Sequence, residues 1–157
     1  MHIALYEPEI PGNTGSIGRV CVGTDTVLHL IGKLGFSLDE KYVRRAGLDY
    51  WKNVQLHQHA DLDALMAALP GRALHFFSAH ATRRYDQVRY GQDDVLVFGC
   101  ETKGLPVAVR QRFAERLLYV PTNGAIRSLN LANVATAVLY EALRQHDFAG
   151  VVPVQAV

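Results

Sequence analysis

The chain has 157 residues, of which 49% are hydrophobic and 20% charged, and its formal net charge is +1 at pH 7. This length suits one domain with a full core, and the composition is typical of a soluble globular protein. The low net charge neither requires nor excludes nucleic acid as a partner.

The chain carries no sign of a membrane or an oxidising compartment. Its apolar runs are too short for a transmembrane helix, and its N-terminus lacks the basic and apolar regions of a signal peptide. The two cysteines, Cys21 and Cys100, predict neither a disulfide framework nor a zinc motif. We therefore expect a cytoplasmic protein with no membrane partner.

Short apolar runs alternate with helical patterns along the chain. Runs that predict strands are 3–6, 27–31, 54–58, 73–78, 94–99 and 116–120. Patterns that predict helices are 14–24, 37–47, 61–69, 106–115 and about 129–146. Several runs lack polar–apolar alternation, as do strands buried on both faces. The pattern predicts an α/β fold with a mainly parallel sheet, in which ligands bind beyond the carboxyl ends of the strands.

Local signals support three of the predicted helices. Ser37 with Glu40 three residues on forms a capping box at the start of one helix. Pro70 and Gly71 are a stop signal after another. Pro106 stands at a plausible first position of a third helix.

The loop EPEIPGNTGSIGR, residues 7–19, is rich in glycine and follows the first predicted strand. Its glycines give G-x-x-G-x-x-G rather than the dinucleotide fingerprint G-x-G-x-x-G, and the second strand ends in Gly32-Lys33, without a ribose-binding acid. A classical dinucleotide site is therefore disfavoured. The alternative is a helix N-terminus that binds phosphate.

Asn13 and Arg19 are the polar side chains of this loop that could act in a site. They stand six residues apart, so both face one side only if Asn13 precedes the first helical turn. The simpler interpretation is that Asn13 is an N-cap and Arg19 a surface charge.

The loop LVFGCETKGLP, residues 96–106, resembles a P-loop in its glycine spacing only. Lys103 precedes Gly104 and Leu105 follows it, so no hydroxyl is present to bind Mg²⁺ and an NTPase is disfavoured. Glu101 could accept hydrogen bonds from N–H groups of a neighbouring loop. The alternative, a tight strand-to-helix turn without a function, stays open.

A third polar cluster lies at the start of the longest predicted helix. Ser128 and Asn130 can cap this helix, after a turn at Asn123-Gly124. Caps account for one or two polar residues, but not for Arg127, Ser128, Asn130 and Asn133 together. This cluster therefore favours a functional site.

Two basic segments are interleaved with aromatic residues. They are KYVRRAGLDYWK, residues 41–52, and RRYDQVRY, residues 83–90. Such segments suit a phosphate backbone and unstacked bases of RNA. Each taken alone is also compatible with a solvated charged face.

The three loops together carry a resemblance to a known family. NTGSIGR, FGCETKGLP and IRSLNLANVATAVLYEA resemble, in order and spacing, the three motifs of the SPOUT-superfamily RNA ribose methyltransferases. The opening YEPEIPGNTG, the segment RRAGLDYW and a length that leaves no room for an added RNA-binding domain bring it close to the members that methylate nucleotide 34 of tRNA. The resemblance covers about residues 1–150.

The resemblance implies a fold, an activity and partners. It implies a single SPOUT domain over residues 1–157, an α/β knot with a mainly parallel sheet and a C-terminal deep trefoil knot. The activity is transfer of a methyl group from S-adenosylmethionine to the ribose 2′-OH of the wobble cytidine or uridine of tRNA. The partners would be the tRNA anticodon arm and a second copy of the chain in a homodimer, with the active site near the interface.

The resemblance also implies site residues. Catalysis would fall to Arg19, supported by Asn13, while Glu101 and Asn130 would brace the loops. The cofactor would be bound at Phe77, Gly99, Val120, Ser128 and Leu129. Arg127 would face the RNA substrate. From the two basic segments we take as candidates for contacting the anticodon arm Lys41, Arg44, Arg45, Arg83 and Arg84.

The family assigns the role of general base to the arginine that Arg19 matches. A guanidinium has a pKa above about 12 and is a poor base. We therefore expect Arg19 to bind a substrate phosphate and orient the hydroxyl instead. Gly12 and Ser16 depart from the Pro and Asn that close relatives often carry, which leaves the base preference at position 34 open.

Other interpretations remain. One is a non-catalytic RNA-binding module on the same fold, and another is 2′-O-methylation of a different RNA, such as ribosomal RNA. A small-molecule nucleotide binder is disfavoured by the missing acid after the second strand. The seven histidines raise the question of a metal, but HQH (57–59) and HFFSAH (75–80) have no matched acid, so we expect none.

Overall fold

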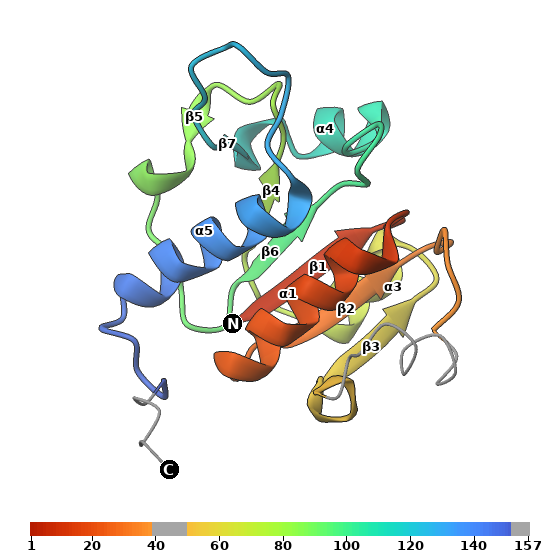
Figure 1. Ribbon diagram of the computed structural model, residues 1–157. Coiled ribbons are helices and arrows are strands. Elements are labelled where there is room, and N and C mark those ends of the chain that lie inside the picture. Colours follow the sequence, from red (N-terminus) through yellow and green to blue (C-terminus); the bar gives the residue numbers. More distant parts are fainter. Residues whose placement is uncertain (39–49, 152–157) are drawn as a thin grey trace.

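The structure, a computed structural model, describes residues 1–38 and 50–151. Its centre is a sheet of seven strands in the order β3-β2-β1-β6-β4-β7-β5 (Figure 1). Every strand pairing is parallel. The strands are β1 (His2–Tyr6), β2 (Val27–Ile31), β3 (Leu56–His59), β4 (Leu74–Phe77), β5 (Arg83–Arg84), β6 (Val95–Phe98) and β7 (Leu117–Tyr119).

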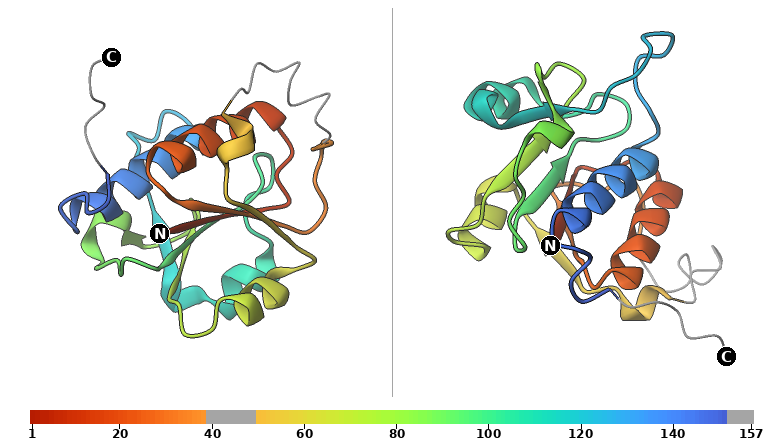
Figure 2. Two further views of the ribbon diagram at one scale, coloured as in Figure 1. Left: turned by 90° about the horizontal axis from the view of Figure 1, so that it is seen from below. Right: turned by 90° about the vertical axis from the view of Figure 1, so that its left-hand side faces the viewer.

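Helices cover both faces of this sheet. On one face α1 (Pro11–Gly23) and α5 (Leu131–Arg144) lie side by side, and on the other lie α3 (Leu62–Ala68) and α4 (Val107–Arg112) (Figure 2). Short 3₁₀ turns occur at η1 (Trp51–Asn53), η2 (Tyr85–Gln87) and η3 (Ala114–Arg116). The α/β fold and the parallel sheet that the sequence predicts are confirmed. No helix of the described residues is long and apolar enough to cross a membrane.

The alternation of strand residues divides the core into two parts. Ile3 and Leu5 of β1 point toward α1 and α5, where Ala135, Val138 and Leu139 of α5 complete the larger cluster. Ala4 of β1 belongs to the smaller cluster under α3 and α4. The fully buried residues of β1 and β6 explain why these runs show no alternation in the sequence.

Two helix starts differ from the prediction by two residues or more. Helix α1 begins at Pro11, three residues before the predicted start, because proline fits the first helical position and has no N–H to leave unpaired. Helix α5 begins at Leu131 rather than at about residue 129, and of its two predicted caps Asn130 is the N-cap. The predicted helix 37–47 falls mostly on residues 39–49, outside the described part of the chain, and residues 37 and 38 are not helical.

Candidate functional site

Three neighbouring strands end at one edge of the sheet. Phe77 pairs in register with Phe98 on one side and Leu118 on the other. The ring of Phe77 stacks on that of Phe98 with 4.6 Å between centroids. The neighbouring strands β4, β6 and β7 are parallel (Figure 1). Because parallel strands present their carboxyl ends together, Phe77, Gly99 and Val120 lie at the same edge. The structure thus brings together these three predicted cofactor contacts.

The loop after β6 turns back on itself. The N–H of Gly104 donates to the carbonyl of Cys100 at 2.9 Å, and Gly104 has a φ of +68°. A Cβ on Gly99 would stand 2.1 Å from the carbonyl carbon of Gly104, so no other residue fits there. The glycine spacing that resembles a P-loop is therefore accounted for by backbone approach within this loop.

Glu101 ties this loop to the entrance of α1. Its carboxylate accepts the N–H of Glu9 at 2.8 Å and the N–H of Ile10 at 3.2 Å. This confirms the prediction that Glu101 accepts bonds from a neighbouring loop. A second set of hydrogen bonds joins the same two loops, because the carboxylate of Glu9 accepts from the N–H and the hydroxyl of Thr102. A negative charge before the first turn also suits the dipole of α1.

Asn13 links the first loop to both of the others. Its amide nitrogen donates to Glu101 Oε1 at 3.0 Å, and its amide oxygen accepts from Asn130 Nδ2 at 2.9 Å. The oxygen of Asn130 in turn accepts the N–H groups of Ala132 and Asn133, which caps α5. The three predicted motif loops are therefore joined by one chain of side-chain bonds, here called the Glu101–Asn13–Asn130 network.

Residues 121–130 form an exposed loop that leads from β7 to α5. Arg127 Nη2 donates to the carbonyl of Thr102 at 2.7 Å, which holds this loop against the loop after β6. Within the described chain, no hydrogen bond uses the backbone groups of Ser128 or Leu129. Unpaired backbone groups beside three converging strand ends suit a ligand such as adenosine, which hydrogen bonds to backbone can hold.

Arg19 does not join the Glu101–Asn13–Asn130 network. Asn13 lies inside α1, so the direction of Arg19, six residues later, differs from that of Asn13 by about 120° around the helix axis. Arg19 is exposed, and its guanidinium carbon stands 4.5 Å from the ring centroid of Tyr50. The condition under which both residues could face one side is not met, and one copy of the chain does not bring them together.

The predicted RNA contacts are only partly described. Arg83 and Arg84 form the exposed edge strand β5. Arg84 makes a two-pronged bond to Asp86, at 2.6 and 2.9 Å, and this bond lowers the pKa of Asp86. Lys41, Arg44 and Arg45 lie outside the described residues. The charge of Arg84 is therefore paired with a carboxylate, whereas Arg83 is bonded to the backbone carbonyl of Gln87.

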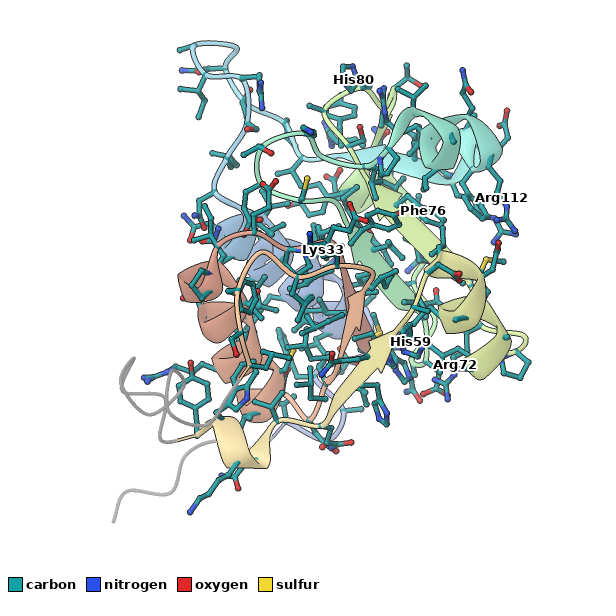
Figure 3. All side chains as sticks on the ribbon, turned by 90° about the vertical axis from the view of Figure 1, so that its right-hand side faces the viewer. Lys33, His59, Arg72, Phe76, His80 and Arg112 are labelled. Carbon is teal, nitrogen blue, oxygen red and sulfur yellow. The ribbon has the colours of Figure 1, made fainter. Side chains whose placement is uncertain are left out.

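A chain of histidines lies apart from this site, on the α3 face of the sheet. Nδ1 of His2 and Nε2 of His29 lie 2.9 Å apart, as do Nδ1 of His29 and Nε2 of His59. Arg72, which can only donate, bonds to Nε2 of His2. Figure 3 shows His59 and Arg72 close together at the edge of the sheet. Each ring can therefore carry its proton on Nδ1 and accept on Nε2.

Burial keeps these histidines uncharged near neutral pH. Burial, followed by the charge of Arg72, lowers the pKa of His2 to about 4, and burial lowers the pKa of His29 to about 3. The pKa of His59 is lowered for the same reason. Among the described residues, no group of three or more His, Cys, Asp or Glu side chains is arranged to hold a metal.

Sequence reasoning missed two contacts of the site. The exchange between Glu9 and Thr102 joins residues 93 positions apart, and neither stands in a recognisable capping pattern. Tyr50 belongs to the basic segment KYVRRAGLDYWK and to RRAGLDYW, but neither pattern predicts its contact with Arg19. The signal for it was the pair of glycines, Gly15 and Gly18, on a helix that something large must cover.

Known proteins match almost the whole chain. A sequence model described as the SpoU rRNA Methylase family matches residues 1–140. A tRNA (cytidine(34)-2′-O)-methyltransferase of Methylovorus glucosotrophus is 47% identical over 154 residues, covering 96% of this chain and 98% of that protein. One of Saccharophagus degradans is 45% identical over 150 residues, covering 95% and 97%.

Solved structures match as well. One solved structure comes from work on the 2-OH methylation of C/U34 on tRNA. It matches this chain with a TM-score of 0.86 and 42% identity, and the match covers 93% of this chain and 95% of that one. The SpoU methyltransferase AviRb of Streptomyces viridochromogenes, in complex with its cofactor AdoMet, has a TM-score of 0.77 and 28% identity, covering 94% of this chain and 58% of that one.

Proposed function

The chain belongs to the SpoU rRNA Methylase family, and we propose that it transfers a methyl group from S-adenosylmethionine to a ribose 2′-OH of tRNA. The substrate nucleotide is cytidine or uridine at the wobble position, 34, as the names of the relatives suggest. The enzyme acts as a single domain, residues 1–157, in the cytoplasm.

The observation that carries this proposal is the Glu101–Asn13–Asn130 network. It joins three loops that are far apart in sequence, at the edge where β4, β6 and β7 end. A structural turn alone does not need partly buried side-chain bonds between three loops. Such bonds fix backbone groups in place, and a ligand held by backbone groups needs that rigidity.

The cofactor would lie against the three strand ends. Phe77, Gly99 and Val120 would line one side, and the backbone of Ser128 and Leu129 would close the other. S-adenosylmethionine, when bound, supplies an electrophilic methyl group on sulfonium. The surrounding loops would exclude water and hold the reacting groups in line.

Arg19 would bind a phosphate next to the target ribose and orient the 2′-OH. Glu101 would brace the loops rather than contact the substrate, because its carboxylate accepts three hydrogen bonds, from Glu9, Ile10 and Asn13. Asn13 would support the site without contacting the substrate, since both ends of its amide are bonded.

The anticodon arm would lie along the basic residues of the exposed loops. Arg127 and Arg83 are exposed, and within residues 1–38 and 50–151 each is bonded only to a backbone carbonyl, so both could reach phosphates. Arg84 would have to leave Asp86 to do so. Lys41, Arg44 and Arg45 are proposed on the sequence alone.

A homodimer and a knot complete the proposal. Because Arg19 faces away from Asn13 on α1, a second copy packed against α1 and α5 would let residues of two protomers meet in one site. The knot would arise where residues 121–130 pass the loop after β6, to which Arg127 is bonded, before α5 returns to α1.

A methyl-transfer assay tests the function. Purified protein is incubated with tritiated S-adenosylmethionine and tRNA from a strain that lacks the endogenous activity, and the labelled nucleotide is mapped. Label on the ribose of nucleotide 34 is expected. The matched control is the same tRNA with a 2′-deoxy nucleotide at that position, which has no hydroxyl to accept the methyl group.

Two other outcomes have distinct meanings. Cofactor binding without label on tRNA would redirect the search to other RNA, and ribosomal RNA is tested next because the family description names it. Absence of both label and cofactor binding would leave only a non-catalytic RNA-binding module.

A further inference from the structure

The glycines of α1 form a surface on which a later segment is docked. Tyr50 donates from its hydroxyl to the carbonyl of Gly15 at 2.7 Å. A Cβ on Gly18 would come within 2.7 Å of the ring of Trp51, so the indole lies directly on the helix backbone. Gly15 and Gly18 are about one turn apart and share a face. Their spacing therefore serves aromatic docking rather than a dinucleotide.

Arg19 emerges beside this docking surface. Its guanidinium lies over the ring of Tyr50, 4.5 Å from the centroid. Within residues 1–38 and 50–151, Arg19 forms neither an ion pair nor a hydrogen bond. An aromatic face attracts the cation without using its N–H donors. Those donors are thus not used by residues 1–38 and 50–151, and an anion can accept from them.

We propose that Tyr50 is the positioning residue for Arg19 in methyl transfer. The ring restricts a long side chain that is otherwise exposed, and the hydroxyl fixes the ring to the same helix that carries Arg19. The inference rests on the proposed role of Arg19 at a phosphate of the substrate. Tyr50 itself touches neither substrate nor cofactor in this proposal.

Two substitutions separate the parts of Tyr50. Tyr50→Phe keeps the ring over Arg19 and removes only the bond to Gly15, so kcat should stay within about threefold of the unmodified enzyme. Tyr50→Leu removes the ring, and kcat should fall by about ten- to a hundredfold because a catalytic group is misplaced. The dissociation constant for S-adenosylmethionine, measured by calorimetry, should stay within about twofold for both.

A second arginine–aromatic pair offers a matched control. Arg112 lies over the ring of Phe113 at 5.0 Å, on α4, the opposite face of the sheet (Figure 3). Phe113→Leu should lower the melting temperature and leave kcat unchanged. If Phe113→Leu and Tyr50→Leu reduce kcat equally, the effect is one of general stability and the proposal is overturned.

A double-mutant cycle tests whether Tyr50 acts through Arg19. Single-turnover rates with excess enzyme are followed for Arg19→Gln with and without Tyr50→Leu. The loss from Tyr50→Leu should shrink to less than about twofold once the guanidinium is absent. An undiminished loss would mean that Tyr50 acts by another route.

The failure of this inference is distinguishable from failure of the proposed function. An unmodified enzyme that labels no RNA refutes the function before any variant is compared. An unmodified enzyme that labels nucleotide 34, with Tyr50→Leu equally fast, refutes only the role of Tyr50. In the two Tyr50 variants the NMR signal of the Arg19 Nε–H reports whether the ring lies over the guanidinium. The ring-current shift of this signal should be kept in Tyr50→Phe and lost in Tyr50→Leu.

Discussion

Asn13 illustrates how one buried amide can hold three distant segments. Its nitrogen and its oxygen each have a partner from another loop, and the side chain is buried in the first turn of α1. A donor and an acceptor on one side chain are what Glu101 and Asn130 require, since Glu101 only accepts and the Asn130 oxygen is already used as a cap. Neither Asp nor Leu could replace it.

Asn13→Ala should lower the free energy of unfolding by about 1–3 kcal/mol, because Glu101 and Asn130 each lose a partner. Urea denaturation measures the change. Asn133→Ala on α5 is the matched control: that side chain is exposed and makes no hydrogen bond in the described chain, so its effect should stay within about 0.5 kcal/mol. Equal losses for both variants would contradict the assigned role of Asn13.

At the scale of elements, the sequence predicts the positions of the strands that have a local apolar pattern. Strand β2 matches its predicted run, and the other predicted strands match theirs within two residues. Strand β5 was missed because Arg83 and Arg84 carry no apolar signal and pair with β7 through the backbone alone. The early start of α1 was missed because Asn13 looked like a cap, whereas Pro11 begins the helix.

The histidines of β1, β2 and β3 predict a dependence of stability on pH. The unfolded chain binds protons at a pKa near 6.5, but the folded chain resists them down to about 4 at His2 and about 3 at His29. The folded state therefore binds fewer protons in this window. The stability that these groups support is present above pH 6.5 and is lost as the pH falls through 4 toward 3.

The free energy of unfolding, measured by urea denaturation between pH 7 and 4, should change by up to about 1.4 kcal/mol per pH unit for each histidine. His29→Leu should make this slope shallower, although it also lowers stability at pH 7 by stranding His2 and His59. His80→Ala, which removes an exposed ring outside the cluster, should leave the slope unchanged. A slope that His29→Leu does not alter would assign the acid sensitivity to carboxylates instead.

At the scale of the whole molecule, the sequence alone could not predict the order of strands. That order depends on which distant segments pack together, and no local pattern encodes it. The resemblance to a family did anticipate that Phe77, Gly99 and Val120 converge. It did not reveal that Arg19 and Asn13 face different sides, because that depends on where α1 begins.

The proposed homodimer predicts a change in mass on substitution at α5. Tyr140 is 46% exposed beside Phe148, an aromatic pair on the helix that packs against α1. Light scattering should give the mass of two chains for the unmodified protein and of one chain for Tyr140→Arg. Val107→Arg, at a residue 56% exposed on α4, is the matched control and should stay dimeric. Dimers that survive Tyr140→Arg would place the interface elsewhere.

The Glu101–Asn13–Asn130 network also affects the order in which parts of the chain fold. Its two side-chain bonds close over sequence separations of 88 and 117 residues, so loops of most of the chain's length must be closed before it exists. Contacts between residues so far apart in the sequence form slowly. During synthesis, Asn13 leaves the ribosome long before its partner Asn130, and β1 to β7 can pair in the interval. The proposed cofactor site should therefore be among the last parts of the nascent protein to form.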